Sequence, residues 1–216
     1  MRTIVYVDAF NLYFRLLAKQ PKYKWLDVAE LARQVLSPKN VLIRVNYYTA
    51  RVSGRLDNEA PARQQIYLDA LASIPEIKIH LGNFLISEKW AGLVHPPQTR
   101  PAMELPRPWP HVVKVIKVEE KGSDVNIASH LVRDAFKNEF DVAAILSNDT
   151  DLVEPVRILT QELGKTVGIL SPVARPAASL ARVAKFVRHI RPDHLKAAQL
   201  PDPIPGSTIA RPPTWV

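Results

Sequence analysis

Apolar residues follow two alternating patterns along the chain, short continuous runs and longer stretches with helical spacing. The runs are rich in β-branched side chains, as in strands buried on both faces of a parallel sheet. They cover residues 3–7, 41–48, 77–81, 83–86, 142–146, 166–170 and 186–190. Helical spacing occurs at 10–19, 27–36, 60–73, 124–137, 151–163 and 177–184. This alternation predicts βαβ units and therefore an α/β fold with a mostly parallel central sheet.

Two proline-rich stretches interrupt this alternation. Residues 95–110 hold six of the 19 prolines, a density that neither a helix nor a central strand tolerates. We expect an extended loop beside the active edge of the sheet, or a disordered insertion. The run 112–118 after it predicts a strand and a hairpin partner for residues 84–94. From Pro192 the chain holds another six prolines, and we expect residues 191–216 to form a tail that drapes over the domain or stays disordered.

Composition narrows the classes of function. The chain has 29 Lys and Arg against 21 Asp and Glu, a net charge of +8. This excess favours a nucleic-acid partner, because basic side chains that contact phosphate supply most non-specific affinity; a merely basic surface is the alternative. The absence of cysteine excludes disulfides, zinc–thiolate sites and thiol nucleophiles.

The same composition bears on location and assembly. The N-terminal residues have no secretory-leader pattern, and no apolar stretch approaches the roughly 20 residues that a membrane helix needs. We therefore expect a cytoplasmic protein that has no membrane partner. A homodimer is the assembly we expect, because two-fold dimers are the commonest oligomers.

Acidic residues stand at three points where a predicted strand gives way to a helix. Asp8 ends the first strand, Asp124 begins the helix 124–137, and Asp149 and Asp151 follow the strand 142–146. Strand ends at one edge of a parallel sheet converge in space. Two carboxylates about 4 Å apart repel by roughly 4 kcal/mol at an effective dielectric near 20. Such a site needs a cation, and hard divalent metals prefer oxygen ligands.

Helix capping explains part of this pattern. Asp8 can cap the helix that follows it, and Asp151 has capping-box spacing to Glu154. Because one residue is enough to cap this helix, capping does not explain Asp149. Asp124 would gain about 0.3–1 kcal/mol from the helix dipole in any orientation. Because it shares the apolar face of its helix, we expect it to point inward.

Polar neighbours of the acids are further candidates for the site. Asn11 lies about one turn beyond Asp8 and suits the orientation of substrate or water. Ser147 could orient a carboxylate or a ligated water. Asn148 stands where a tight turn favours positive φ, which Asn tolerates. Lys121, before Gly122, could contact phosphate or neutralise the acids.

Basic and aromatic side chains elsewhere are candidates for contact with nucleic acid. The basic ones are Arg51, Arg55, Arg63, Lys114, Lys117, Arg175 and Arg182. Any one of them alone is more often an isolated surface charge. Tyr48, Trp90 and Trp109 could stack on bases, although aromatic side chains more often belong to the core.

Three short blocks together resemble the NYN domain, a branch of the PIN-like nuclease superfamily. They are Val7-Asp8-Ala9-Phe10-Asn11, Glu120-Lys121-Gly122-Ser123-Asp124-Val125-Asn126 and Leu146-Ser147-Asn148-Asp149-Thr150-Asp151-Leu152. The resemblance covers about residues 1–190. It implies one domain of that extent, with a Rossmann-like three-layer α/β/α sandwich and ribonuclease activity on single-stranded RNA at a Mg²⁺ or Mn²⁺ site lined by acids. The implied catalytic residues are Asp8, Asn11, Asp124, Asp149 and Asp151, of which the four aspartates would bind metal.

Two departures from the family pattern are visible. Asn148 replaces the usual Gly, and His130 stands where many members have a further acid. On a helical wheel His130 lies about 120° from Asp124, so we do not count it as a ligand.

Three alternative functions stay open at this point. A haloacid-dehalogenase-type phosphatase needs an acid two residues after its nucleophile, where this chain has Phe10. A non-catalytic module would use the acids to hold metal and the basic surface to bind RNA or a partner protein. A nuclease that acts on DNA would need the same acids.

Overall fold

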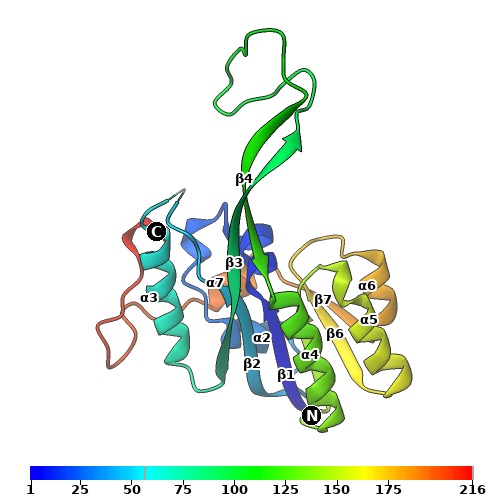
Figure 1. The fold of residues 1–216 in the computed structure, drawn as a ribbon. Coiled ribbons are helices and arrows are strands. Elements are labelled where there is room, and N and C mark those ends of the chain that lie inside the picture. The colour runs from blue at the N-terminus through cyan, green and yellow to red at the C-terminus, as the bar shows by residue number, and fades with distance from the viewer. Residues whose placement is uncertain (56, 216) are drawn as a thin grey trace.

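A single seven-stranded sheet organises the computed structural model, which describes residues 1–55 and 57–215 (Figure 1). The strand order is β4-β3-β2-β1-β5-β6-β7. The strands are β1 Arg2–Asp8, β2 Val41–Ala50, β3 Ile77–Gly92, β4 Val112–Lys121, β5 Val142–Leu146, β6 Thr166–Ser171 and β7 Phe186–His189. All neighbouring pairs are parallel except β3 and β4. The predicted mostly parallel sheet is confirmed.

Helices cover both faces of this sheet. They are α1 Ala9–Leu12, α2 Val28–Val35, α3 Ala60–Ala72, α4 Ser123–Phe136, α5 Val153–Arg157, α6 Ala178–Val183 and α7 Pro192–Ala197. Alternate residues of β1 point to opposite faces: Val5 and Val7 pack with α2 and α3, while Ile4 and Tyr6 pack with α4 and α5. This three-layer α/β/α arrangement is the Rossmann-like, PIN-like fold. No helix among the described residues combines the length and apolar character that a membrane crossing needs.

Two of the predicted helices are not uniform α-helices. After α1 the chain continues as a π-helix over Tyr13–Leu17, and after α5 over Ile158–Glu162. Hydrogen bonds from residue i+5 to residue i place side chains five apart on one side. Leu12 and Leu17 are accordingly both buried. The sequence pattern of helical spacing does not separate these two geometries.

β3 is one 16-residue strand rather than the two short strands that the sequence predicts. Its first part pairs in parallel with β2, and Asn83–Gly92 pairs antiparallel with β4. Gly82 lies at the change of partner, where a Cβ would come within 2.5 Å of Glu120 Oε1 and 2.9 Å of the Lys121 carbonyl oxygen. A larger residue there would displace β4, so the crossing of the two strands requires glycine.

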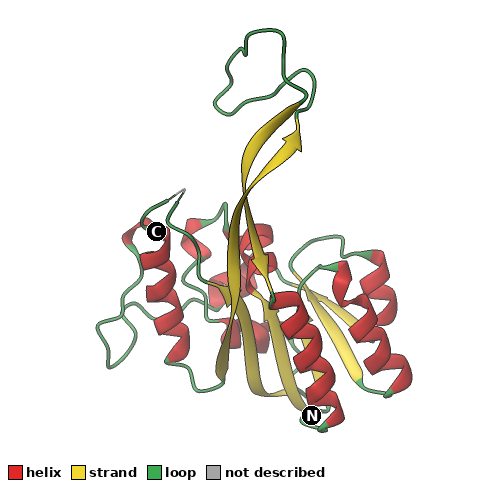
Figure 2. Cartoon of the chain, viewed as in Figure 1, coloured by secondary structure: helices red, strands yellow, loops and turns green. Residues whose placement is uncertain are grey.

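The predicted hairpin is confirmed, and it projects from the body of the protein (Figure 2). We call residues 83–121 the arm; the proline-rich residues 95–110 lie in the loop at its tip. This loop is neither helix nor strand, as expected, but it lies away from the sheet edge rather than beside it. Its side-chain hydrogen bonds are local, for example Trp109 Nε1 to the Leu105 carbonyl oxygen.

The chain beyond Pro192 drapes over the domain rather than being disordered. Leu195, Leu200 and Ile204 are buried in the same core cluster as α2 and α3. The indole of Trp25 donates to the Pro201 carbonyl oxygen over 3.0 Å. The division into a domain 1–190 and a tail 191–216 stays a prediction.

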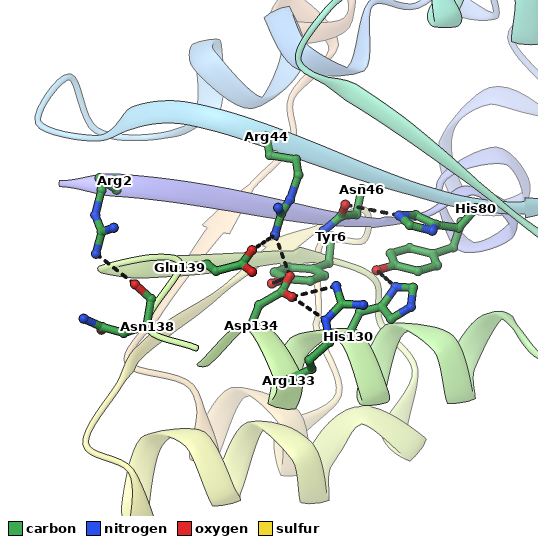
Figure 3. A network of polar contacts seen from close by, with 11 residues as sticks. Arg2, Tyr6, Arg44, Asn46, His80, His130, Arg133, Asp134, Asn138 and Glu139 are labelled. Carbon is green, nitrogen blue, oxygen red and sulfur yellow. Dashed lines mark hydrogen bonds and ion pairs between the residues drawn. The ribbon is translucent and has the colours of Figure 1, made fainter. Parts of the chain in front are cut away.

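A polar network fixes α4 against the sheet (Figure 3). Asp134, fully buried, accepts hydrogen bonds from Tyr6 on β1 and Arg44 on β2, over 2.8 and 2.7 Å. It also accepts from its neighbour Arg133. His130, one turn earlier, is bonded through Nδ1 to the Tyr48 hydroxyl. These contacts hold the C-terminal half of α4, and with it the position of Asp124 at the other end.

Candidate acidic site at the carboxyl edge of the sheet

Asp8 is the most buried acid of the predicted site. It ends β1, is 5% exposed, and caps α1 through Oδ1, which accepts from the Asn11 backbone N–H over 2.9 Å. Oδ2 accepts from the Ser147 hydroxyl over 2.9 Å. Burial raises the pKa of Asp8, these hydrogen bonds lower it, and the charge of Asp149 raises it again. Capping and site formation therefore use the same carboxylate.

Ser147 joins the ends of the two central strands. It follows β5, whose Leu146 pairs with Val7 of β1, and it is fully buried. Its Oγ also accepts from the Asp149 backbone N–H over 3.1 Å. One hydroxyl thus orients Asp8 and fixes the loop that carries Asp149, the orienting role expected of Ser147.

Asp149 and Asp151 do not have the capping roles that the sequence predicts. Asp149, rather than Asp151, is the cap: its Oδ1 accepts from the Asp151 backbone N–H over 3.0 Å. Asp151 and Glu154 form no capping box: the Asp151 N–H is bonded to Asp149, and Glu154 is paired with Arg157. Asp151 is exposed at the start of the helical segment.

Asn11 and Asn148 tie the loops around the site together. The Asn11 side-chain oxygen accepts from the Asn148 backbone N–H over 3.2 Å. The Asn148 side-chain oxygen in turn accepts from the Ala177 N–H over 2.8 Å. The expected positive φ at Asn148 is wrong; among the described non-glycine residues Asn138 has it. Side-chain bonding, not turn conformation, explains Asn at position 148.

Asp124 reaches the site from the first turn of α4. Gly122 starts this helix with φ +102°, a conformation that favours glycine. Asp124 is half-buried, and its pKa is raised to about 6, first by burial and then by the charges of Asp8 and Asp149. Glu120 and Asp151 contribute further. The acids from distant segments therefore repel one another, as the sequence predicts.

Three of the four predicted aspartates share one pocket of about 290 Å³. Its lining is Asp8, Phe10, Asn11, Phe14, Arg15, Glu120, Asp124 and Asp149. Asp151 does not line it. Sequence reasoning missed Glu120 and Arg15. Glu120 lies two residues before Gly122 on β4, and its Oε1 accepts from the Ser123 N–H over 3.0 Å; only the pairing of β4 with β3 brings it to the pocket.

The donor set of this pocket fits a divalent cation, although the acids are not gathered into a finished metal site. Among residues 1–55 and 57–215, no three His, Cys, Asp or Glu side chains form a ready-made metal-binding group. The pocket nevertheless offers carboxylates from Asp8, Asp124 and Asp149, and the pKa of Asp124 is raised by burial and, after it, by the charges of the other two. A hard cation would relieve that repulsion. Glu120 is a fourth possible donor.

The predicted basic contacts lie outside the pocket. Lys117 and Lys121 are both paired with Glu119, and Arg51 is bonded to Gln65. Arg63 and Lys114 also pair with acids. Arg175 and Arg182 are exposed. Arg15, next to the acids, is the basic residue that the structure adds.

Fold and site together define a protein of the PIN-like class, with acids gathered at the carboxyl edge of a Rossmann-like sheet. The family model of the NYN domain matches residues 2–190, and the chain belongs to this nuclease-like family.

Individual proteins with similarity to the chain include a curated relative and a solved structure. The 6-hydroxy-3-succinoylpyridine 3-monooxygenase HspA of Pseudomonas putida is 29% identical over 241 residues, covering 100% of this chain and 75% of the relative. A crystal structure of a protein of unknown function from Vibrio parahaemolyticus shares the fold with a TM-score of 0.54 at 16% identity, over 89% of this chain and 94% of that one.

Proposed function

We propose that this protein is a divalent-metal-dependent ribonuclease that hydrolyses phosphodiester bonds of single-stranded RNA. The observation that carries the proposal is the shared pocket of Asp8, Asp124 and Asp149, which come from three distant segments. Membership of a nuclease-like family and the net charge of +8 support it. Mg²⁺ or Mn²⁺ is the proposed cofactor.

The residues of the pocket have separable roles in this proposal. Asp8, Asp124 and Asp149 would hold the ion. Asp151, which does not line the pocket, would contact the ion only through a bridging water. A bound metal ion would supply a water of lowered pKa and would neutralise charge on the phosphate. Ser147 keeps Asp8 oriented, and Asn11 holds the loop of Asn148. Arg15 faces the same pocket and can pair with a phosphate oxygen.

Glu120 is the proposed proton acceptor. It lines the same pocket as Asp8 and belongs to β4, at the base of the arm. A carboxylate that is not engaged by an ion can accept a proton from the attacking water. The leaving oxygen takes a proton from solvent, since the pocket is open to the surface.

Cleavage of a labelled single-stranded RNA with Mn²⁺ tests this function. The native protein should cleave, and Asp149→Asn should lower the rate at least 100-fold, because a ligand is lost. Asp193→Asn is the control, since Asp193 is an exposed acid of α7 outside the pocket. Metal-dependent RNA binding by a native protein that does not cleave would identify a non-catalytic module instead.

Parallel reactions with single- and double-stranded DNA decide the class of nucleic acid. Preference for RNA is expected. Faster cleavage of DNA under the same conditions would contradict the ribonuclease assignment while leaving the metal site in place.

A second candidate function is oxygenation of a heteroaromatic ring. The name of the Pseudomonas relative describes a monooxygenase of a substituted pyridine. Such a reaction inserts one atom of dioxygen and needs two electrons from a reductant to convert the other atom to water. The specific observation in its favour is an aromatic cavity next to the acids. Consumption of dioxygen with a pyridine substrate and NADH would support this candidate, and its absence would leave the nuclease proposal alone.

A further inference from the structure

A second cavity, of about 280 Å³, adjoins the acidic pocket. Six aromatic side chains line it: Phe10, Tyr13, Phe14, Tyr47, Tyr67 and Trp215. They come from α1, the π-helix after it, β2, α3 and the C-terminal segment. This volume is close to the lower end of small-molecule sites, which suits one ring system rather than an extended ligand.

The polar lining of the cavity includes two hydroxyls on β2, besides Lys24, Gln64 and the paired Asp57 and Arg63. Tyr47 and Thr49 are alternate residues of β2, so their side chains point to the same face. Both line the cavity, and no hydrogen bond to another of the described residues involves either hydroxyl. In contrast, Gln64 uses both side-chain atoms on backbone groups of Val52 and Ala50. The cavity thus combines an aromatic wall with two hydroxyls that can bind heteroatoms.

The cavity and the acidic pocket share a wall. Phe10 and Phe14 line both and stack on each other with ring centroids 6.4 Å apart. Burial raises the pKa of the Tyr47 hydroxyl, and the charge of Asp8 raises it further. A ligand that spans the two Phe side chains would therefore have one end among aromatic rings and the other at the acids.

We propose that the aromatic cavity binds a planar heteroaromatic ring whose attached anionic group lies at the acidic pocket. The ring would pack against Tyr67 and Trp215, with its heteroatoms bonded to Tyr47 and Thr49. The anion would be held by Arg15 and by the cation of the proposed function, on which this part of the inference rests. A nucleotide of RNA and a free heteroaromatic carboxylate share this chemistry.

Tryptophan fluorescence tests the ring site without reference to cleavage. We would use full-length protein with Trp90→Phe and Trp109→Phe, so that Trp25 and Trp215, in contact with each other, supply the signal. The probes are adenosine 5′-monophosphate, uridine 5′-monophosphate and pyridine-3-carboxylate, each with Mg²⁺. Saturable quenching by at least one probe is expected. A nucleotide preference would identify RNA as the source of the ring, and a carboxylate preference would identify a small-molecule substrate.

Two kinds of variant locate the binding. Tyr47→Phe and Thr49→Val remove a hydroxyl each with little change of shape, and each should weaken binding about two- to tenfold. Ala60→Leu would fill the cavity from the start of α3 and abolish quenching, whereas Ala72→Leu, at the exposed end of the same helix, should not. Quenching that Ala60→Leu and Tyr47→Phe leave unchanged would overturn the proposal.

Failure of this inference is distinguishable from failure of the proposed nuclease. RNA cleavage by native protein, together with no quenching by any of the three probes, would refute the ring site and leave the nuclease intact. Quenching that depends on Tyr47, in a protein that cleaves neither RNA nor DNA, would support the ring site and refute the nuclease.

Discussion

At the scale of single residues, Ser147 connects the buried acid to the late acidic loop. Its hydroxyl donates to Asp8 and accepts from the Asp149 N–H. Removal of this hydroxyl leaves the carboxylate of the buried Asp8 without one of its partners, whereas the Asp149 N–H is only part-buried. The loss of the buried partner costs about 1–3 kcal/mol.

Ser147→Ala should therefore lower both stability and activity. We expect about 1–3 kcal/mol less free energy of unfolding in urea, and at least tenfold slower RNA cleavage, since groups that orient metal ligands contribute on that scale. Ser171→Ala is the matched control: Ser171 is a buried serine at the end of β6 whose hydroxyl bonds the backbone of Val173. Equal loss of cleavage in both variants would contradict an orienting role for Ser147.

Asp124 gives the metal-free protein a dependence on pH. Its pKa is raised from 3.8 to about 6 in the folded protein. The stability that this shift contributes is fully present below pH 3.8 and is lost as the pH rises through about 6. Two pKa units correspond to about 3 kcal/mol, which solvent screening at this half-exposed group reduces to about 1–2 kcal/mol.

Asp124→Asn should consequently stabilise the metal-free protein at pH 7.5 but not at pH 4. The expected gain is about 1 kcal/mol after the loss of the favourable helix-dipole interaction. Thermal unfolding with a chelator at the two pH values measures it. Addition of Mg²⁺ should stabilise the native protein more than the variant. A less stable variant at pH 7.5 in chelator would show that Asp124 is not repelled by its neighbours.

The elements of the sheet core were predictable, whereas the contacts between distant elements were not. Runs such as 142–146 are apolar at every position because both faces are covered, so they are recognisable as parallel strands. Beyond Gly82, β3 has only exposed and partly buried residues, and its continuity depends on its partner β4. Glu120 was missed for the same reason, since its place in the pocket is set by cross-strand pairing.

The outer part of the arm is held by few hydrogen bonds, and these are local. The Leu93 N–H bonds the His111 carbonyl oxygen over 2.9 Å, and beyond this pair the hydrogen bonds are local, as between Thr99 and Met103. At the base of the arm, by contrast, Phe84 contacts Phe10 edge-on, with ring centroids 5.4 Å apart.

Replacement of residues 94–110 by an Asn-Gly turn should change the free energy of unfolding by less than about 0.5 kcal/mol. Urea unfolding measures this. Phe84→Ala, at the base, should instead cost about 1–3 kcal/mol through lost packing. A large destabilisation by the shortened loop, similar to that of Phe84→Ala, would mean that the tip contacts the body in solution.

At the scale of the whole molecule, the net charge of +8 predicts how RNA binding responds to salt. Basic residues that contact phosphate release counterions, with a slope of about −0.7 per contact for single strands. Binding of RNA to the inactive Asp149→Asn variant should therefore weaken at least about tenfold between 50 and 200 mM salt, as three or more contacts require. Fluorescence anisotropy measures this affinity.

Arg175→Gln should lessen the salt slope by about 0.7 if Arg175 contacts phosphate. Arg2→Gln is the control, because Arg2 begins β1 at the opposite end from Asp8. An equal effect of both variants on the salt slope would mean that RNA binds to basic residues over the whole surface and not specifically at the carboxyl edge of the sheet. Sedimentation of the same samples would test the predicted homodimer.

The aromatic cavity shows the limit of sequence reasoning for the whole chain. Its walls come from α1, β2, α3 and Trp215, and no local spacing relates these positions. The acids could be predicted because each follows a recognisable strand or begins a helix. The cavity could be predicted only from the path of the C-terminal segment, and the proline content of that segment does not determine its path.

The unbroken course of β3 has a mechanical consequence. Asp8 ends β1 near the middle of the sheet, whereas Glu120 belongs to the hairpin that projects from the sheet beyond Gly82. Because the two strands of the hairpin are paired from Asn83 to Gly92, a displacement of the tip would be transmitted to Glu120. A macromolecule bound to the tip of the arm would thus change the distance between Glu120 and Asp8 without contacting either residue.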